Sequence, residues 1–354
     1  MVEWLAGNRI RGTTAERPLA SLQSPSVGGW VELGRHVIGT ASSEVFVASL
    51  PDKRYYMVLY EDKGEASANA RLLRYNSDAN NIYSNRVSTN GASDTEQNTQ
   101  PQLNGWNGNN TTPQFNVWYI ANLAGKEKLL ISQGVMQGTA GAGTVPARTE
   151  YAGKWANTAD AINRIGVIQN ASTHSTGTTM TVLGWDPTDT HTTNFWEELA
   201  SVTTTGAGTS ISSGTFTAKK YIWFQMYAPS GQSAIVDNFW VRFNGDSGST
   251  YARRYSNNGG TDGTATSDSK IQISRNGKEG DFINAFIINN SANEKLLIAH
   301  SISVGDTLGA GSAPNRGETV GKWTNTSSQI TSIVVSANAD SIPAGWIIKV
   351  WGSD

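Results

Sequence analysis

The chain has 354 residues, a length that predicts about two domains of ~150 residues each. Its 27 Lys and Arg residues against 29 Asp and Glu residues give a net charge of −2. That balance argues against nucleic acid or an anionic membrane as the main partner, because both favour a basic face. The absence of cysteine excludes disulfide scaffolds, zinc knuckles, iron–sulfur sites and thiol catalysis.

The first 29 residues have no regular hydrophobic period and too little apolar surface to fold alone. Glu3 stands near the start and no apolar run follows it, so we expect no signal peptide. We expect an extended arm over 1–29 that becomes ordered on a neighbouring subunit, with a frayed tail as the alternative. The candidate assembly residues of this arm are Trp4, Arg9, Arg11 and Arg17.

The rest of the chain is duplicated. Residues 141–158 read GAGTVPARTEYAGKWANT, and residues 309–326, which start 168 positions later, read GAGSAPNRGETVGKWTNT. Offsets of 166 to 168 residues align much of the two halves, and the offset of 166 aligns Trp185 with Trp351. Because self-similarity at a fixed spacing indicates repeated structural units, we expect four segments: an arm over 1–29, a repeat over 30–187, a linker over 188–194 and a second repeat over 195–354.

Strand signals follow in both copies. Aromatic and β-branched runs of strand length lie in the first copy at 54–60, 115–120 and 128–132. Similar runs lie in the second copy at 220–227, 282–288, 295–299, 330–336 and 342–351, whereas the run at 161–165 is compatible with a strand or a turn of helix. Asn-Gly steps, which favour tight hairpin turns, occur at 90–91, 104–105, 107–108, 258–259 and 276–277.

Seven or eight short strands per copy predict an all-β chain. The expected architecture is two tandem antiparallel β-sandwich domains preceded by the extended N-terminal arm. A jelly roll fits best, because that topology uses eight strands with long connecting loops. The twelve tryptophans supply much of the apolar area that such cores bury.

The sequence carries no recognisable catalytic motif. Its four histidines are His36, His174, His191 and His300, and no two of them stand at matched positions of the two copies. A glycosidase would need two facing carboxylates, but Glu127 lies in a lysine-flanked turn and Glu150 follows Arg148 by two residues, where the charges neutralise each other. We expect no enzyme activity, no catalytic residue, no metal site and no cofactor.

One charged and aromatic group recurs in both copies. Its members are Arg148, Glu150, Lys154 and Trp155, which match Arg316, Glu318, Lys322 and Trp323. It could form a sugar-binding platform, or a loop held by an ion pair with its Trp in the core and the lysine stem over the ring. We favour the structural interpretation, because both copies should keep a feature that defines the fold.

Two turns carry oxygen-bearing side chains at 76–78 and 244–246, with Asp94 and Asp262 further along the chain. Calcium takes such ligands. The spacing is not that of the twelve-residue calcium loop, and Asn, Asp and Gly are also ordinary turn residues. Whether calcium binds there stays open.

Several segments resemble a known group of proteins. The opening WLAGNRIRGTTAERP, the KRYYMVL run, the block GAGTVPARTEYAGKWANTADAINRI and the closing VLGWDP resemble uncharacterised virion-structural proteins of tailed phages and related marine viruses. The resemblance covers most of the chain. It implies a particle component with tandem β-sandwich repeats and supplies no catalytic residue. The second copy departs at TFTAKKYIWFQ, where the first has SLPDKRYYMVL, which suggests that the two domains have divided their roles.

We therefore expect a non-enzymatic structural protein of the virion surface, in the capsid, as a capsid decoration or in a tail fibre. It would be made in the host cytoplasm and anchored by its arm. The expected partners are other virion proteins and further copies of the chain, with a trimer favoured. A double-jelly-roll major capsid protein is a less favoured variant, because the two copies align almost without gaps. The alternative function is a carbohydrate-binding adhesin that recognises host glycans through Trp106, Tyr83 and Tyr251.

Overall fold

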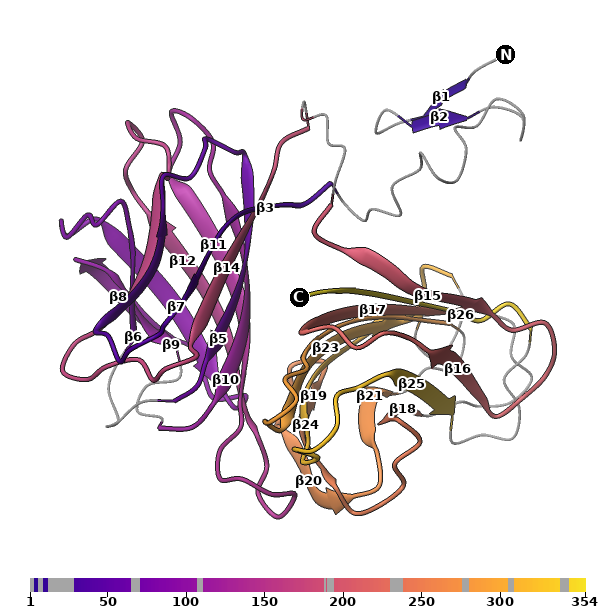
Figure 1. Ribbon diagram of the computed structural model, residues 1–354. Helices are drawn as coiled ribbons and strands as arrows, with labels where there is room; N and C mark the ends of the chain where they lie inside the picture. Colours follow the sequence, from indigo (N-terminus) through magenta and orange to yellow (C-terminus); the bar gives the residue numbers. More distant parts are fainter. Residues whose placement is uncertain are drawn as a thin grey trace.

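The computed structural model describes residues 3–5, 9–11, 29–64, 71–106, 111–187, 189, 194–229, 238–275, 280–304, 309–337 and 344–354. For 3–5, 9–11 and 105–106 this description covers the backbone alone. Within these ranges all regular elements are β-strands, which confirms the all-β prediction (Figure 1). None of the described residues belongs to a helix long and apolar enough to span a membrane.

The first half folds into two antiparallel sheets. In spatial order, the eight-stranded sheet consists of β3 (Val31–Val37), β14 (Thr179–Trp185), β5 (Tyr55–Asp62), β10 (Gln114–Ala121), β11 (Lys128–Met136), β12 (Ala147–Trp155), β7 (Tyr83–Thr89) and β8 (Thr95–Gln100). The four-stranded sheet consists of β4 (Glu44–Ala48), β13 (Arg164–Gln169), β6 (Arg71–Tyr75) and β9 (Leu103–Trp106).

The second half repeats this arrangement strand for strand. Its eight-stranded sheet consists of β15 (Glu197–Thr203), β26 (Ile347–Ser353), β17 (Tyr221–Ala228), β22 (Asp281–Ile288), β23 (Lys295–Ser303), β24 (Asn315–Trp323), β19 (Tyr251–Asn257) and β20 (Gly263–Asp268). Its four-stranded sheet consists of β16 (Ser210–Thr215), β25 (Ser332–Ala337), β18 (Asn238–Phe243) and β21 (Ile271–Arg275). The shared order shows that the two halves are copies of one fold.

The topology is an extended jelly roll. The strand order β3-β14-β5-β10 within the large sheet and the order β4-β13-β6-β9 of the small sheet place the first strand of each layer beside the last strand of that layer, β14 or β13. This is the eight-stranded jelly-roll pattern. The remaining strands β11, β12, β7 and β8 lengthen the large sheet beyond it. The prediction of seven or eight strands therefore missed part of each copy.

Each half has its own hydrophobic core between its two sheets. In β5 the alternating residues Tyr56, Val58 and Tyr60 point into the first core, as expected for a strand whose side chains change face at every step. Met57 and Leu59 point to the opposite face and are also buried. The continuous apolar run at 55–60 thus reflects burial on both faces of the sheet.

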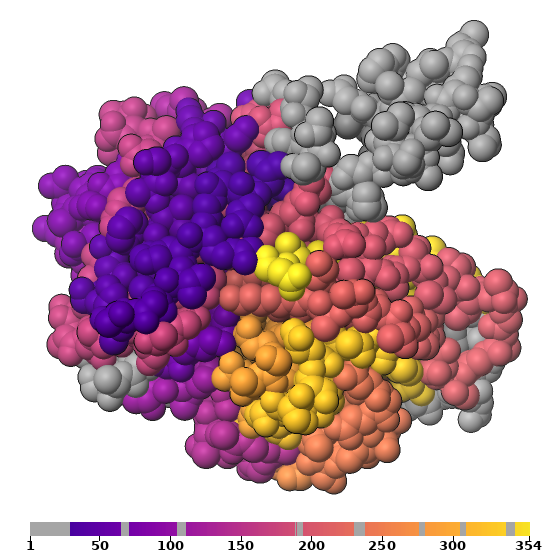
Figure 2. All heavy atoms as spheres, in the orientation of Figure 1, coloured from indigo at the N-terminus to yellow at the C-terminus, as the bar shows by residue number. Residues whose placement is uncertain are grey.

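A third apolar cluster joins the two halves. Side chains from the outer faces of both large sheets form it, with Met57, Leu59, Phe115, Val117, Val135 and Leu183 from the first half and Phe195, Trp196, Tyr221, Phe286, Ile288, Leu296, Ile298, Val320 and Trp351 from the second. The two lobes accordingly lie against each other in the space-filling view (Figure 2). The domains are held together by an apolar interface as well as by the chain connection.

Three local expectations need comment. In the first half Trp185 of β14 pairs with Tyr55 of β5, and in the second half the matching Tyr221 of β17 pairs with Ser353 of β26. The residue that matches Trp185 is therefore Ser353, and the predicted alignment of Trp185 with Trp351 is wrong by two residues. The Asn-Gly steps at 90–91 and 258–259 do form hairpin turns with positive φ, whereas 104–105 lies within β9. The steps at 107–108 and 276–277 lie outside the described residues.

The N-terminal segment contains a short antiparallel hairpin instead of a wholly extended chain. Its strands are β1 (Glu3–Leu5) and β2 (Arg9–Arg11), and Trp4 pairs with Ile10. Residues this few carry no usable strand period, which is why the sequence did not predict them. The side chains of Trp4, Arg9 and Arg11 and all of Arg17 lie outside the described part, so the anchoring role of the arm stays a prediction.

Candidate functional site

The repeated tryptophans are core residues. Trp155 and Trp323 are both fully buried. The indole Nε1 of Trp155 donates to Oδ2 of Asp78 at 3.0 Å, and that of Trp323 donates to Oδ2 of Asp246 at 2.7 Å. The same contact in both copies ties the end of one strand to the turn before its neighbour. This part of the recurring group has a structural role.

The aspartates of the two turns at 76–78 and 244–246, and Asp94 and Asp262, also make structural contacts. Asp78 and Asp246 accept the indole hydrogen bonds, Asp94 lies 3.8 Å from the guanidinium of Arg86, and Asp262 lies 2.8 Å from that of Arg148. Among the described residues no cluster of three or more His, Asp or Glu side chains is arranged to hold a metal ion. The geometry therefore favours turn chemistry over calcium binding.

Tyr83 and Tyr251 are not ligand-binding aromatics, and this expectation is wrong. Both side chains are fully buried and stack on Trp155 and Trp323 with interplanar angles of 16°. Their hydroxyls donate to backbone oxygens of the turns at 78 and 246. Both tyrosines follow a turn, a position that suggested exposed side chains. In the structure they are the first residues of β7 and β19, and their side chains face the core. The side chain of Trp106 lies outside the described residues.

The repeated lysines have diverged. The side chain of Lys154 is about half exposed, and its Nζ lies 3.2 Å from Glu127. Lys322 is fully buried and donates to the backbone oxygens of Gln137 at 3.2 Å and Thr139 at 2.6 Å in the first domain. Desolvation lowers the pKa of Lys322, whereas nearby Glu294 raises it. The difference arises because residues of the first domain cover this part of the second domain's large sheet.

Replacing Lys322 by Met should lower the free energy of unfolding by about 1–3 kcal/mol, because charge-assisted hydrogen bonds between the domains are lost and Glu294 loses a cation. The matched change Lys154→Met should alter it by less than about 0.5 kcal/mol, since its pair is exposed. Urea denaturation followed by tryptophan fluorescence measures both. Equal effects would contradict the structural asymmetry.

The repeated arginines also differ. Arg148 is buried between the domains, where it pairs with Glu150 and with Asp262 of the second domain. Arg316 is exposed and pairs with Glu318. His300 lies near both arginines. Its burial and the positive charges of Arg148 and Arg316 lower the pKa of His300 to about 4, so this imidazole is neutral at pH 7. Glu150, His300, Arg316 and Glu318 line a polar cleft of about 470 Å³, and each of the two glutamates is paired with an arginine.

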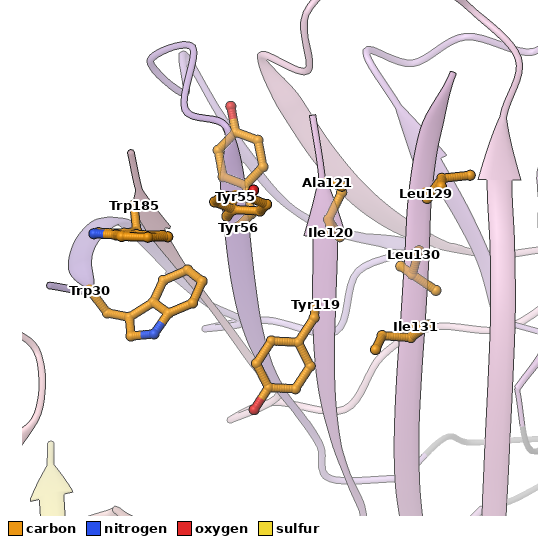
Figure 3. Close-up of a pocket in the computed structure, with 10 residues that line it drawn as sticks. All are labelled: Trp30, Tyr55, Tyr56, Tyr119, Ile120, Ala121, Leu129, Leu130, Ile131 and Trp185. Carbon is orange, nitrogen blue, oxygen red and sulfur yellow. The ribbon is translucent and has the colours of Figure 1, made fainter. Parts of the chain in front are cut away.

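The outer face of the first domain's large sheet carries an apolar groove. Its volume is about 400 Å³, and the outward-facing side chains that line it are Trp30, Tyr55, Tyr119, Ala121, Leu129, Ile131 and Trp185 (Figure 3). Leu129 and Ile131 are 54% and 61% exposed. The rings of Tyr55 and Trp185 stack at 5.4 Å. Exposed apolar patches of this kind mark interaction surfaces.

Sequence reasoning missed this groove, although a signal was present. In β11, Leu129, Leu130 and Ile131 follow one another, and a strand sends alternate residues to opposite faces. Leu130 enters the core, so Leu129 and Ile131 must point outward. A strand with apolar residues on both faces predicts that something packs on the outer one.

The fold and the groove define the class: a tandem jelly-roll β-sandwich protein with an exposed apolar sheet face. No protein-family model matches the chain, and no curated protein matches it. Among solved structures, domains LG4-5 of the mouse laminin alpha1 chain are similar at 11% identity, with 94% of this chain and 93% of that chain covered and a TM-score of 0.19. Ail, the attachment invasion locus protein of Yersinia pestis, is similar at 7% identity, with 78% and 98% covered and a TM-score of 0.13. Scores this low support no inference about this chain.

Proposed function

We propose that the protein is a non-enzymatic structural subunit of a virus particle, exposed in its shell or tail. The observation that carries the assembly role is the apolar groove on the large sheet. It offers aromatic and aliphatic side chains and no ionisable group other than tyrosine, a chemistry that suits another protein surface. The virus setting comes from the sequence resemblance, and the tandem fold is compatible with it.

The charged groups of the described residues support a role without catalysis. The repeated Arg–Glu pairs neutralise each other, and Arg148 serves to join the domains. The glycan-binding alternative loses two of its three residues, because Tyr83 and Tyr251 are buried. Docking to protein is therefore the function that the surface favours.

The proposal is tested on purified particles. We expect quantitative mass spectrometry of particles to find this chain in stoichiometric amount with the shell or tail proteins. The variant Ile131→Asp places a charge in the groove and should reduce incorporation at least tenfold, whereas Lys154→Asp, at an exposed site on β12, should leave incorporation unchanged. Absence of the wild-type chain from particles would contradict the proposed function.

The arm is tested separately. Deletion of residues 1–28 should leave the thermal transition of the two domains unchanged, because both cores are built from residues beyond position 29. The same deletion should prevent incorporation into particles. Normal incorporation of the truncated chain would contradict an anchoring role for the arm.

A further inference from the structure

The two domains contact each other through different faces of equivalent sheets. The second domain contributes Trp196, Tyr221, Phe286, Ile288, Leu296 and Ile298, here called the docking face, and in addition Phe195, Val320 and Trp351. The first domain accepts them on Met57, Leu59, Phe115, Val117, Val135 and Leu183, here called the receiving face. All of these side chains are buried. The interface is therefore heterologous over these residues, because one copy of the fold uses one surface and the other copy uses another, although Trp351, at the position matched to Leu183, also takes part.

The first domain has its own docking face, of which Trp30 and Tyr119 pack partly against the cluster between the domains, whereas Tyr55, Leu129 and Ile131 are exposed. The matched strands place Trp30, Tyr55, Tyr119, Ala121, Leu129 and Ile131 at the positions of the second domain's docking residues. These residues line the groove of Figure 3. Leu129 and Ile131 are 54% and 61% exposed, whereas their counterparts Leu296 and Ile298 are 1% and 3% exposed. The same side chains are thus buried in one copy and open in the other.

The second domain has its own receiving face, whose outer part is also open, whereas Trp223 and Trp351, at the positions of Met57 and Leu183, pack in the cluster between the domains. Phe282 and Ile302 stand at the positions of Phe115 and Val135, and they are 40% and 49% exposed. Tyr227, beside them on β17, is half exposed as well. These side chains border a cleft of about 380 Å³. The outer part of the receiving face has therefore kept its apolar character.

The centre of this second receiving face is more polar than that of the first. Gln225 and Asn284 replace Leu59 and Val117, and Oδ1 of Asn284 accepts from Trp223 Nε1 at 2.6 Å and from Gln225 Nε2 at 3.0 Å. A contact made here buries less apolar surface than the one inside the chain. It should consequently be weaker and depend on protein concentration.

We propose that these chains associate head to tail, with the docking face of one chain's first domain seated on the receiving face of the next chain's second domain. A second copy is the favoured occupant because the same two faces already meet once within each chain. Repetition of a heterologous contact produces a ring if the rotation closes and a filament if it does not. This inference deepens the proposed function and rests on it only for its biological setting, since self-association can be measured on the purified chain.

Light scattering after size-exclusion chromatography tests the association on the full chain. We expect the wild-type chain to form species of several chains that dissociate on dilution. Ile131→Arg in the docking face and Ile302→Arg in the receiving face should each give single chains. Val37→Arg, at an exposed apolar position outside both faces, should associate like the wild type. A circular dichroism spectrum and melting temperature equal to those of the wild type confirm that each variant is folded.

Mixing the two variants tests the head-to-tail geometry. Ile131→Arg keeps an intact receiving face and Ile302→Arg keeps an intact docking face, so an equimolar mixture should form complexes of two chains that grow no further. A wild-type chain that stays single at every concentration overturns the inference. Association that survives Ile302→Arg but not Ile131→Arg also overturns it, because docking faces would then pair with each other. Failure of the chain to enter particles, with association intact, would count against the proposed function alone.

Discussion

Replacing Arg71 by Met should lower the free energy of unfolding by about 3–5 kcal/mol, the usual effect of breaking a buried ion pair. Arg71 and Asp62 are both fully buried in the first domain, and Nε of Arg71 lies 2.5 Å from Oδ2 of Asp62. Tyr60 and the backbone nitrogen of Gly64 also donate to Asp62, each at 2.9 Å. Without the guanidinium, the buried carboxylate of Asp62 loses its arginine partner and keeps the neutral donors and the nearby imidazole of His174.

The second domain provides the control for this prediction. At the matched positions it has Ala228 and Phe239 instead of Asp62 and Arg71, and Phe239 packs against Trp346 at 4.9 Å. The double variant Asp62→Ala with Arg71→Phe should therefore be more stable than Arg71→Met, because no charge is left unpaired. Urea denaturation at pH 7 measures all three chains. A double variant less stable than Arg71→Met would contradict the ion-pair argument.

The pH dependence of the pair has a defined sign. Burial raises the pKa of Asp62, but the imidazole of His174, 3.7 Å away, and the charge of Arg71 outweigh it and lower this pKa to about 2. Since the unfolded carboxyl has a pKa near ~3.9, the stabilisation is fully present above pH ~4 and is lost as the pH falls towards 2. Measurement at pH 7 therefore captures the whole effect.

Replacing Asp281 by Asn should stabilise the protein at pH 8 by about 2–4 kcal/mol and change little at pH 4. Asp281 occupies the position of Gln114 and is 2% exposed, with Ser274 Oγ donating to it at 2.6 Å. Burial raises the pKa of Asp281 to about 7, although the Ser274 hydrogen bond lowers it. The folded state thus favours the protonated acid, so its stability falls as the pH rises from ~4 to 7 and levels off above that.

The difference between variant and wild type isolates this carboxyl, because all other titrating groups are common to both chains. Urea denaturation at pH 4 and pH 8 gives that difference directly. A difference of the same size at the two pH values would show that Asp281 ionises in the folded state as it does in solution.

Much of the fold was predictable, because its determinants are local or repeated in the chain. The recurrence of GKW predicted two copies, and runs of aromatic and β-branched residues predicted the strands. The missed strands β8 and β20 read TEQNTQ and GTATSD and form exposed edges of the large sheets. A strand that buries no side chain has no apolar period to detect.

The interacting surfaces could be predicted only in part. The recurring Trp155 and Trp323 were assigned to the core, where they lie, whereas Tyr83 was placed on the surface and is buried. Lys154 and Lys322 are identical in their local sequence, GKW, yet one is solvated and the other is enclosed. Local sequence cannot separate such a pair, because the enclosing atoms belong to residues about 185 positions away.

The sequence by itself determined that this protein is a duplicated all-β chain, since β-branched and aromatic runs and turn residues act over a few positions. Only the tertiary structure decided which copy of each sheet face is buried. The two domains are alike in fold, but they meet through unlike faces, so burial at Leu296 and exposure at Leu129 follow from domain packing. That asymmetry leaves the outer parts of one docking face and one receiving face exposed on every chain.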